Sequence, residues 1–274
     1  MELLDITQNE YFALRGDPPL VSSTMLKCFR QEGPWTYHHV HEANLGEPRV
    51  PSASMKIGTL FHDFAAHCGA PKWKVIPNTY SDGEPINLRK KAHREFVGEI
   101  QQAAKDEGTI AVGWEQSEKI IKMYDSVLAN KQIAEMIQQE AKREVVGTGV
   151  IEDVGVKGMA DVLLDDRTII DYKTTSRHTP EDFLQDIYRF RYHWQAAFYM
   201  DLFTGLKFYI VAVRNFEPYE AMMYQIPESL IQMAMRSNRQ ALTEIAWCRA
   251  IRSWHSPGWE GPINVEEGIQ RRTR

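Results

Sequence analysis

The residues best suited to chemistry lie between Val154 and Ser176. Two apolar runs rich in β-branched residues flank the polar cluster Asp165-Asp166-Arg167, a pattern typical of a β-hairpin. With the loop centred on this cluster, the pairing register sets Asp171 directly opposite Asp161, and Lys173 shares their face because it follows Asp171 by two residues. Opposed carboxylates repel each other, so a protein that keeps them together either raises the pKa of one or supplies a cation.

Paired carboxylates beside an ammonium group suit hydrolysis assisted by a metal ion. Carboxylate oxygens are the ligands that Mg²⁺ takes in sites that process phosphates. Lys173 could orient or deprotonate the attacking water, or stabilise the negative charge that develops. The alternative is structural, with solvated carboxylates at strand ends and Lys173 in an ordinary surface ion pair. The spacing alone leaves both interpretations open.

Motifs along the chain resemble those of the PD-(D/E)XK nuclease superfamily. Gly158-x-x-Asp161 followed by Asp171-Tyr172-Lys173 is similar to its central signature, in the Asp-x-Lys form. Four other segments resemble motifs of its RecB-like branch, in the expected order: Val21 to Phe29, Gly58 to His62, Thr174-Thr175 and Tyr192 to Tyr199. The resemblance covers residues 20 to 215 and looks greatest to the RecE-type (exodeoxyribonuclease VIII) recombination exonucleases of phages and prophages.

This resemblance implies an α/β fold with a restriction-endonuclease-like core. A mixed central β-sheet would be flanked by helices, and an N-terminal helical layer would supply His62. The implied metal ligands are His62, Asp161, Asp171 and the backbone carbonyl of Tyr172, which would hold one or two Mg²⁺ ions, with Mn²⁺ as a substitute. Lys173, Gln195 and Tyr199 would join the two aspartates in catalysis.

The remaining candidates are an accessory carboxylate and a set of DNA contacts. Glu144 would be the accessory carboxylate, although a salt bridge at a strand end explains it as well. The basic run after residue 88 is either a solvated helix face or a patch that contacts phosphate. The candidate DNA-binding residues are Thr174, Thr175, Tyr192, Arg89, Lys90 and Lys91.

The segment from Thr179 to Phe203 is predicted to form one continuous helix. Thr179 is a good N-cap, and Pro180 and two acidic residues follow it. Four residues with polar tips fall on one stripe of this helix: Tyr188, Tyr192, Gln195 and Tyr199. Polar tips favour a stripe that lines a cleft, and the alternative is an aromatic stripe that packs against the core.

Periodicity and turn residues predict the other elements. We expect helices from residue 24 and over 54–68, 94–107, 115–142 and 227–251, and strands over 142–146, 150–151, 207–214 and 220–225. Residues 71–90 are predicted to be loop, and the histidine-rich stretch within 33–54 a solvated or substrate-facing loop. The predicted organisation is an N-terminal lead-in and helical segment (1–53), a nuclease core with a helical elaboration (54–255) and a C-terminal tail (256–274).

Composition excludes several classes of protein. The net charge of −5 argues against a protein that coats nucleic acid by bulk charge, but it leaves an enzyme with a basic channel open. Three widely separated cysteines (Cys28, Cys68 and Cys248) support no zinc site, disulfide framework or iron–sulfur cluster. With no basic-then-apolar leader and no long apolar run, we expect a cytoplasmic protein without a membrane partner. The absence of a Gly-x-x-x-x-Gly-Lys-Ser/Thr loop argues against an ATP-driven motor.

The function that the resemblance implies is metal-dependent exonuclease activity on the ends of linear double-stranded DNA. Such enzymes digest one strand processively from 5′ to 3′ without ATP, form ring-like homo-oligomers, and pass the 3′ overhang to a single-strand annealing protein. One alternative is a non-catalytic DNA-end-binding or scaffold module of the same fold, against which the intact His, Asp, Asp and Lys set argues. The other is a restriction-type endonuclease.

Overall fold

A six-stranded mixed β-sheet forms the centre of the computed structural model, which describes residues 1–46 and 51–254. The strand order is β1-β4-β5-β6-β7-β8. Strands β6 and β7 pair in parallel and all other neighbours are antiparallel. The strands are β1 (Glu2–Leu4), β4 (Ala141–Ile151), β5 (Val154–Leu164), β6 (Thr168–Thr175), β7 (Lys207–Arg214) and β8 (Ala221–Gln225). The predicted α/β fold with a mixed central sheet is confirmed.

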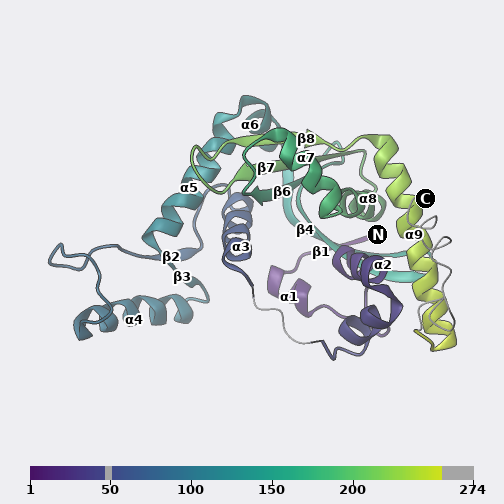
Figure 1. Ribbon diagram of the computed structural model, residues 1–274, viewed down its shortest axis with the longest axis horizontal. Coiled ribbons are helices and arrows are strands. Elements are labelled where there is room, and N and C mark those ends of the chain that lie inside the picture. Colours follow the sequence, from purple (N-terminus) through teal and green to yellow (C-terminus); the bar gives the residue numbers. More distant parts are fainter. Residues whose placement is uncertain (47–50, 255–274) are drawn as a thin grey trace, which may run out of the picture.

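Helices flank the sheet, and the buried apolar residues divide into two cores (Figure 1). Helices α2, α7, α8 and α9 contribute to the first core, and α3, α5 and α6 to the second. A smaller parallel pair, β2 (Trp73–Ile76) and β3 (Ile110–Gly113), carries α4 away from the body of the molecule. The helices are α1 (Gln8–Ala13), α2 (Ser23–Tyr37), the π-helical turn η1 (His38–Glu42), α3 (Ala53–Ala66), α4 (Lys91–Asp106), α5 (Trp114–Ala129), α6 (Lys131–Ile137), α7 (Pro180–Arg189), α8 (Tyr192–Leu202) and α9 (Glu228–Ile251).

The β5–β6 hairpin has the predicted register. Val162 pairs with Ile170, and the same offset sets Asp161 against Asp171. Side chains of a strand alternate between the two faces of its sheet. Ile170 and Tyr172 belong to the second core, so Asp171 and Lys173 lie on the opposite face of β6.

The predicted helix over 179–203 is wrong as a single element, because the structure has two helices there. The N-cap prediction holds, since the Thr179 hydroxyl accepts a hydrogen bond from the Asp182 amide at 3.1 Å. Helix α7 ends at Arg189, and Arg191 has a left-handed φ of 59° immediately before α8. A left-handed residue interrupts the helical path. Tyr188 therefore belongs to α7, where it is 54% exposed, and does not continue the stripe on α8.

Other boundaries also differ from the prediction. The predicted helix over 115–142 is divided at Asn130, whose side chain caps α6, and residues from Ala141 belong to β4. The predicted loop over 71–90 contains strand β2, and strand β3 was not predicted. The predicted lead-in contains strand β1 and helix α1. The histidine-rich stretch is helical as far as Glu42. The predicted tail over 256–274 lies outside the described residues.

The N-terminal segment is built into the same sheet as the hairpin. Strand β1 pairs with β4 along one edge, and Val21 forms a parallel bridge with Val156 of β5. Leu26 and Phe29 of α2 are buried in the first core. No helix within residues 1–46 and 51–254 is both long and apolar enough to cross a membrane.

Candidate active site

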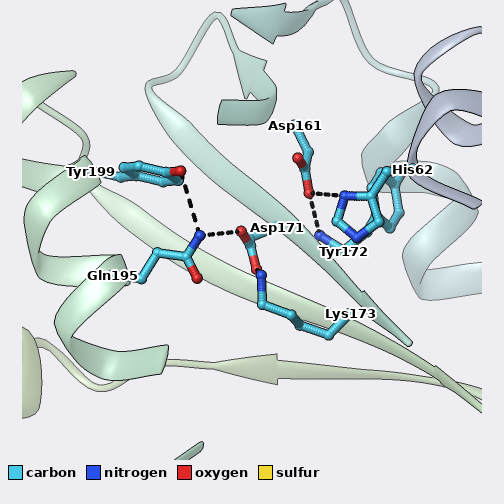
Figure 2. Close-up of polar contacts among 7 residues, drawn as sticks. All are labelled: His62, Asp161, Asp171, Tyr172, Lys173, Gln195 and Tyr199. Carbon is cyan, nitrogen blue, oxygen red and sulfur yellow. Dashed lines mark hydrogen bonds and ion pairs between the residues drawn. The ribbon is translucent and has the colours of Figure 1, made fainter. Parts of the chain in front are cut away.

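Asp161 and Asp171 meet where the β5–β6 pairing ends (Figure 2). The Tyr172 backbone amide donates a hydrogen bond of 2.7 Å to Asp161 Oδ2. This carboxylate therefore ties β6 to β5 just beyond the Val162–Ile170 pair. The Tyr172 ring lies on the other face, 1% exposed, with its centroid 5.8 Å from that of Phe61. Because successive side chains of a strand point to opposite faces, Asp171 and Lys173 point away from the face on which the Tyr172 ring is buried.

Asp171 and Lys173 form a buried ion pair between the carboxylate Oδ2 and the ammonium Nζ. Their side chains are 4% and 15% exposed. Burial raises the pKa of Asp171 and the neighbouring Asp161 carboxylate adds to this rise, although Lys173 acts in the opposite direction. Burial alone would lower the pKa of Lys173, but the two aspartates outweigh it and raise the pKa. Lys173 is therefore held in its charged form.

Helix α8 supplies two further contacts from the other side of Asp171. Gln195 Nε2 lies 3.2 Å from Asp171 Oδ1, to which it donates a hydrogen bond. The same nitrogen lies 3.4 Å from the Tyr199 hydroxyl. Tyr199 is 7% exposed, and burial raises its pKa, so the phenol stays protonated. These contacts orient the Asp171 carboxylate from α8 while Lys173 holds its second oxygen (Figure 2).

His62 reaches the site from α3. The Ser52 side chain caps this helix by accepting a hydrogen bond from the Met55 amide, and the buried rings of Phe61 and Phe64 anchor it in the second core. His62 Nδ1 then lies 3.2 Å from Asp161 Oδ2.

The contact between His62 and Asp161 shifts the pKa of both groups. Burial alone would lower the pKa of His62, but Asp161 reverses this and raises it. Burial alone would raise the pKa of Asp161, but His62, Lys173 and the Tyr172 amide lower it. The two carboxylates are therefore shifted in opposite directions, with the pKa of Asp161 lowered and that of Asp171 raised.

A pair of glycines lets α8 approach the sheet closely. Gly147 and Gly158 face each other across β4 and β5. A Cβ atom on Gly158 would lie 2.9 Å from Leu202 Cδ2 and 3.2 Å from Tyr199 Cε1, and one on Gly147 would lie 2.6 Å from Phe203 Cε1. The C-terminal half of α8 thus sits in a depression that only glycine leaves open. The glycine of the Gly158-x-x-Asp161 motif has this packing role.

Glu144 lies beside Asp161, but outside the cavities that the other site residues line. The β4–β5 ladder includes the pairs on either side of Glu144 and Asp161 but omits this pair, and Glu144 has a left-handed φ of 48°. Such a local break resembles a β-bulge in its effect, because it re-aims side chains next to it. Burial raises the pKa of Glu144, and Asp161 contributes to the rise.

Two cavities meet at the site and share His62 and Lys173 as lining residues. The first, of about 450 Å³, also contains Asp161, Asp171, Gln195 and Tyr199 in its wall and is closed by residues from the N-terminal segment. The second, of about 580 Å³, is lined by Gly58, Thr174, Thr175, Tyr192 and further polar residues. A Cβ on Gly58 would lie 3.4 Å from Thr174 Oγ1, so α3 packs directly against this part of β6.

The candidate DNA contacts divide into two groups. Thr174, Thr175 and Tyr192 line the second cavity, and Lys173 Nζ lies 5.1 Å from the Tyr192 ring centroid. Thr175 Oγ1 accepts a hydrogen bond from the Arg177 amide at 3.0 Å. The basic run of Arg89, Lys90 and Lys91 lies elsewhere, at the start of α4 on the projecting arm, and lines neither cavity. All three residues are exposed. Lys90 pairs with Glu84, and Lys91 pairs with Glu95.

Comparison with known proteins identifies the family. A family model described as "PDDEXK-like domain of unknown function (DUF3799)" matches residues 22–259. The chain belongs to this PDDEXK-like family. No curated protein matches it.

Among solved structures, a candidate exonuclease from Eubacterium rectale is similar to this PDDEXK-like chain, with a TM-score of 0.61 and 12% sequence identity over 96% of this chain and 98% of that one. This likeness shows a shared fold. An alkaline exonuclease from Laribacter hongkongensis (TM-score 0.29, 13% identity, 61% of this chain and 89% of that one) also matches. So does a phage-related exonuclease from Haemophilus somnus (TM-score 0.29, 15% identity, 74% of this chain and 97% of that one).

The donor set of this PDDEXK-like site suits a hard divalent cation. In the described part of the chain, no three His, Cys, Asp or Glu side chains are arranged as a ready metal site. Lys173 instead pairs with Asp171, and His62 contacts Asp161. Asp171 Oδ2 is buried against the Lys173 ammonium, and Asp161 and Asp171 both line the first cavity, so their carboxylate oxygens fit a hard divalent cation. The residues that would hold it are Asp161, Asp171, His62 and the backbone carbonyl of Tyr172.

Sequence reasoning missed most of the residues that enclose the site. In the first cavity these are Tyr11, Phe12, Arg15 and Lys157, and in the second Arg177, Arg189 and Asn215. One sequence signal could have placed Tyr11 and Phe12 on a helix. Thr7 and Glu10 form a capping box, in which each side chain accepts a hydrogen bond from the other residue's backbone amide, and this pattern predicts the start of α1.

Proposed function

We propose that this chain is a metal-dependent nuclease that hydrolyses phosphodiester bonds of double-stranded DNA from its ends. The observation that carries the proposal is the convergence of Asp161, Asp171 and Lys173, with His62, at the junction of two cavities. Membership of a PDDEXK-like family supports it, as does the shared fold with a candidate exonuclease over nearly the whole chain.

The roles of the residues follow from their contacts. Asp161, Asp171, His62 and the Tyr172 carbonyl would hold Mg²⁺, or Mn²⁺ in its place, and the bound ion would lower the pKa of a water molecule and stabilise charge on the phosphate. Lys173, held in its charged form, orients the attacking water and stabilises the negative charge that develops. Gln195 keeps Asp171 oriented through the 3.2 Å hydrogen bond, and Tyr199 in turn supports Gln195. Glu144, next to Asp161, is an accessory carboxylate in this proposal.

The substrate strand would leave the reaction centre through the second cavity. Thr174, Thr175 and Tyr192 offer hydroxyl groups along this route, and hydroxyl groups are common donors to phosphate oxygens. The basic run from Arg89 to Lys91 lies on the projecting arm, so its contacts would be with duplex further from the cleaved end.

The finer proposal follows from the sequence resemblance to RecE-type enzymes. We infer digestion of one strand from 5′ to 3′ without ATP, leaving a 3′ overhang for recombination. A homo-oligomer and a single-strand annealing protein as partner belong to the same proposal. Strand polarity is tested by placing the label on either the 5′ or the 3′ end of one strand.

The decisive experiment follows end-labelled linear duplex and covalently closed circular duplex with Mg²⁺ or with EDTA. The expected result is Mg²⁺-dependent shortening of the linear DNA, an intact circle and no shortening with Lys173→Ala. Lys142→Ala, which removes an exposed lysine from β4 of the same sheet, is the matched control and should retain activity.

Three outcomes would overturn the proposal in different ways. DNA binding without cleavage under Mg²⁺ or Mn²⁺ would favour a DNA-end-binding or scaffold module. Cleavage of the circle to fragments of fixed length would favour a restriction-type endonuclease. Full activity of Lys173→Ala would refute the proposed role of that lysine.

A further inference from the structure

An exposed phenylalanine forms part of the wall of the catalytic cavity. Phe12 is 66% exposed, which makes it the most exposed aromatic side chain among residues 1–46 and 51–254. It lines the same cavity as Asp161, Asp171 and Lys173. Isolated exposed apolar side chains are ordinary on protein surfaces, so exposure alone assigns no role. The exposure of this ring gains meaning from its position in the wall of a cavity that carries reactive groups.

The backbone on both sides of Phe12 is fixed by a buried lysine. Lys157 Nζ donates hydrogen bonds to the Tyr11 carbonyl at 2.9 Å and to the Leu14 carbonyl at 2.5 Å. Lys157 is 8% exposed and extends from β5 of the catalytic hairpin, four residues before Asp161. Burial lowers its pKa, a cost that its hydrogen bonds offset. The hairpin therefore holds the Phe12 segment in place, and the ring makes an edge contact with Tyr11, at 5.4 Å between centroids.

We propose that Phe12 is a stacking platform for a nucleobase of the DNA strand at the reaction centre. This inference rests on the proposed nuclease function and deepens it, because it assigns the first cavity to an unpaired base. Aromatic side chains stack on every base type and so bind single strands without sequence preference. The cavity also contains Arg15, whose guanidinium donates to Asn44 Oδ1 at 2.8 Å. A cation and an exposed ring in one cavity match a ligand with both a phosphate and a π-face better than an apolar peptide.

The test is a binding cycle in EDTA, so that no cleavage is needed. Fluorescein-labelled duplex with a short single-stranded tail is compared by anisotropy with the same duplex whose tail is abasic. Phe12→Ala should weaken binding of the base-bearing tail by about 5- to 150-fold, corresponding to ~1–3 kcal/mol for one stacked base. On the abasic tail, wild type and Phe12→Ala should agree within about twofold.

Control variants separate stacking from other effects. Trp247→Ala removes a tryptophan of similar exposure (59%) on α9 that lines none of the cavities described, and it should bind both probes as wild type does. Phe12→Trp should keep the preference for bases, and Phe12→Leu, which keeps apolar bulk without a ring, should lose most of it. Circular dichroism should show all variants folded, because Phe12 buries little of its side chain.

The outcomes distinguish this inference from the proposed function. Equal binding of the base-bearing tail by wild type and Phe12→Ala would overturn the stacking role, even if wild type hydrolyses DNA. An equal loss on both tails would also overturn it, because the effect would then not need a base. A base-dependent loss in a protein that hydrolyses no DNA would support stacking while refuting the nuclease.

Discussion

The substitution Gly158→Ala tests how closely α8 must approach the sheet. The added methyl would lie 2.9 Å from Leu202 Cδ2 and 3.2 Å from Tyr199 Cε1, both closer than ordinary contacts. Overpacking of this kind costs about 1–3 kcal/mol. The substitution also removes conformational freedom from the unfolded chain, which stabilises the native state by roughly 0.4–1 kcal/mol. We therefore expect a net loss of about 1–2 kcal/mol in the free energy of unfolding.

The same displacement should reach the candidate active site. If α8 moves away from β5, the 3.2 Å hydrogen bond from Gln195 to Asp171 lengthens and the carboxylate loses one of its two supports. Small misplacements of reacting groups have large effects on rate, so Mg²⁺-dependent hydrolysis should fall by about threefold to tenfold. A selective loss of rate at unchanged DNA affinity would locate the effect at the reaction centre.

Urea unfolding monitored by circular dichroism measures the stability term. The matched control is Gly98→Ala in α4, where no atom lies within 4 Å of the new methyl. The free energy of unfolding of this control should rise by about 0.8–1.0 kcal/mol, because alanine favours a helix interior more than glycine does. Leu202→Val shortens the side chain that the new methyl meets, so combining it with Gly158→Ala should give a smaller loss than the sum of the single losses.

Two results would refute this reasoning. Gly158→Ala as stable and as active as wild type would show that α8 does not depend on the glycine pair for its position. Strict additivity with Leu202→Val would show that the loss arises elsewhere. In either case the role of Gly158 would have to be sought in the backbone of β5 and not in helix packing.

Two further variants test the ion pair and the wall of the first cavity. Asp171→Asn should destabilise the fold by about 3 kcal/mol, at the lower end for a broken buried ion pair because Asp161 stays near Lys173. In urea unfolding, adding Lys173→Met should recover most of this loss. A double variant as unstable as Asp171→Asn would contradict the pairing. Lys157→Met should speed amide hydrogen exchange across α1 and leave β6 unchanged, and unchanged exchange in α1 would show that other contacts hold it.

The hairpin could be predicted because its information is local. A short polar loop between apolar runs fixes the pairing, and alternation then decides which side chains share a face. The observed pairing of Val162 with Ile170 is the predicted one. Strand β7, whose apolar run is bounded by Gly205 and Asn215, was predicted with its observed bounds for the same reason.

The surroundings of the hairpin depend on contacts between distant segments, which local patterns do not contain. In the sequence, Lys157 cannot be told from an ordinary lysine on a strand. Its role follows from hydrogen bonds to carbonyl groups more than 140 residues earlier in the chain. Strands β2 and β3 form a separate sheet, and in the sequence one precedes α4 and the other follows it. Each has four residues, too few to give a clear alternation of apolar and polar side chains. The wall of the first cavity therefore could not be predicted from spacing.

The break between α7 and α8 shows how a correct set of site residues can follow from a wrong element. A continuous helix would carry Tyr188 and Gln195 on one stripe, but the left-handed Arg191 redirects the chain. Tyr188 remains exposed on α7, while Gln195 and Tyr199 still share a face because both lie within α8 at a spacing of four residues. Their spacing needed only local helix. The direction in which that helix faces was decided by a backbone conformation that periodicity cannot detect, and by the glycine pair on which it packs.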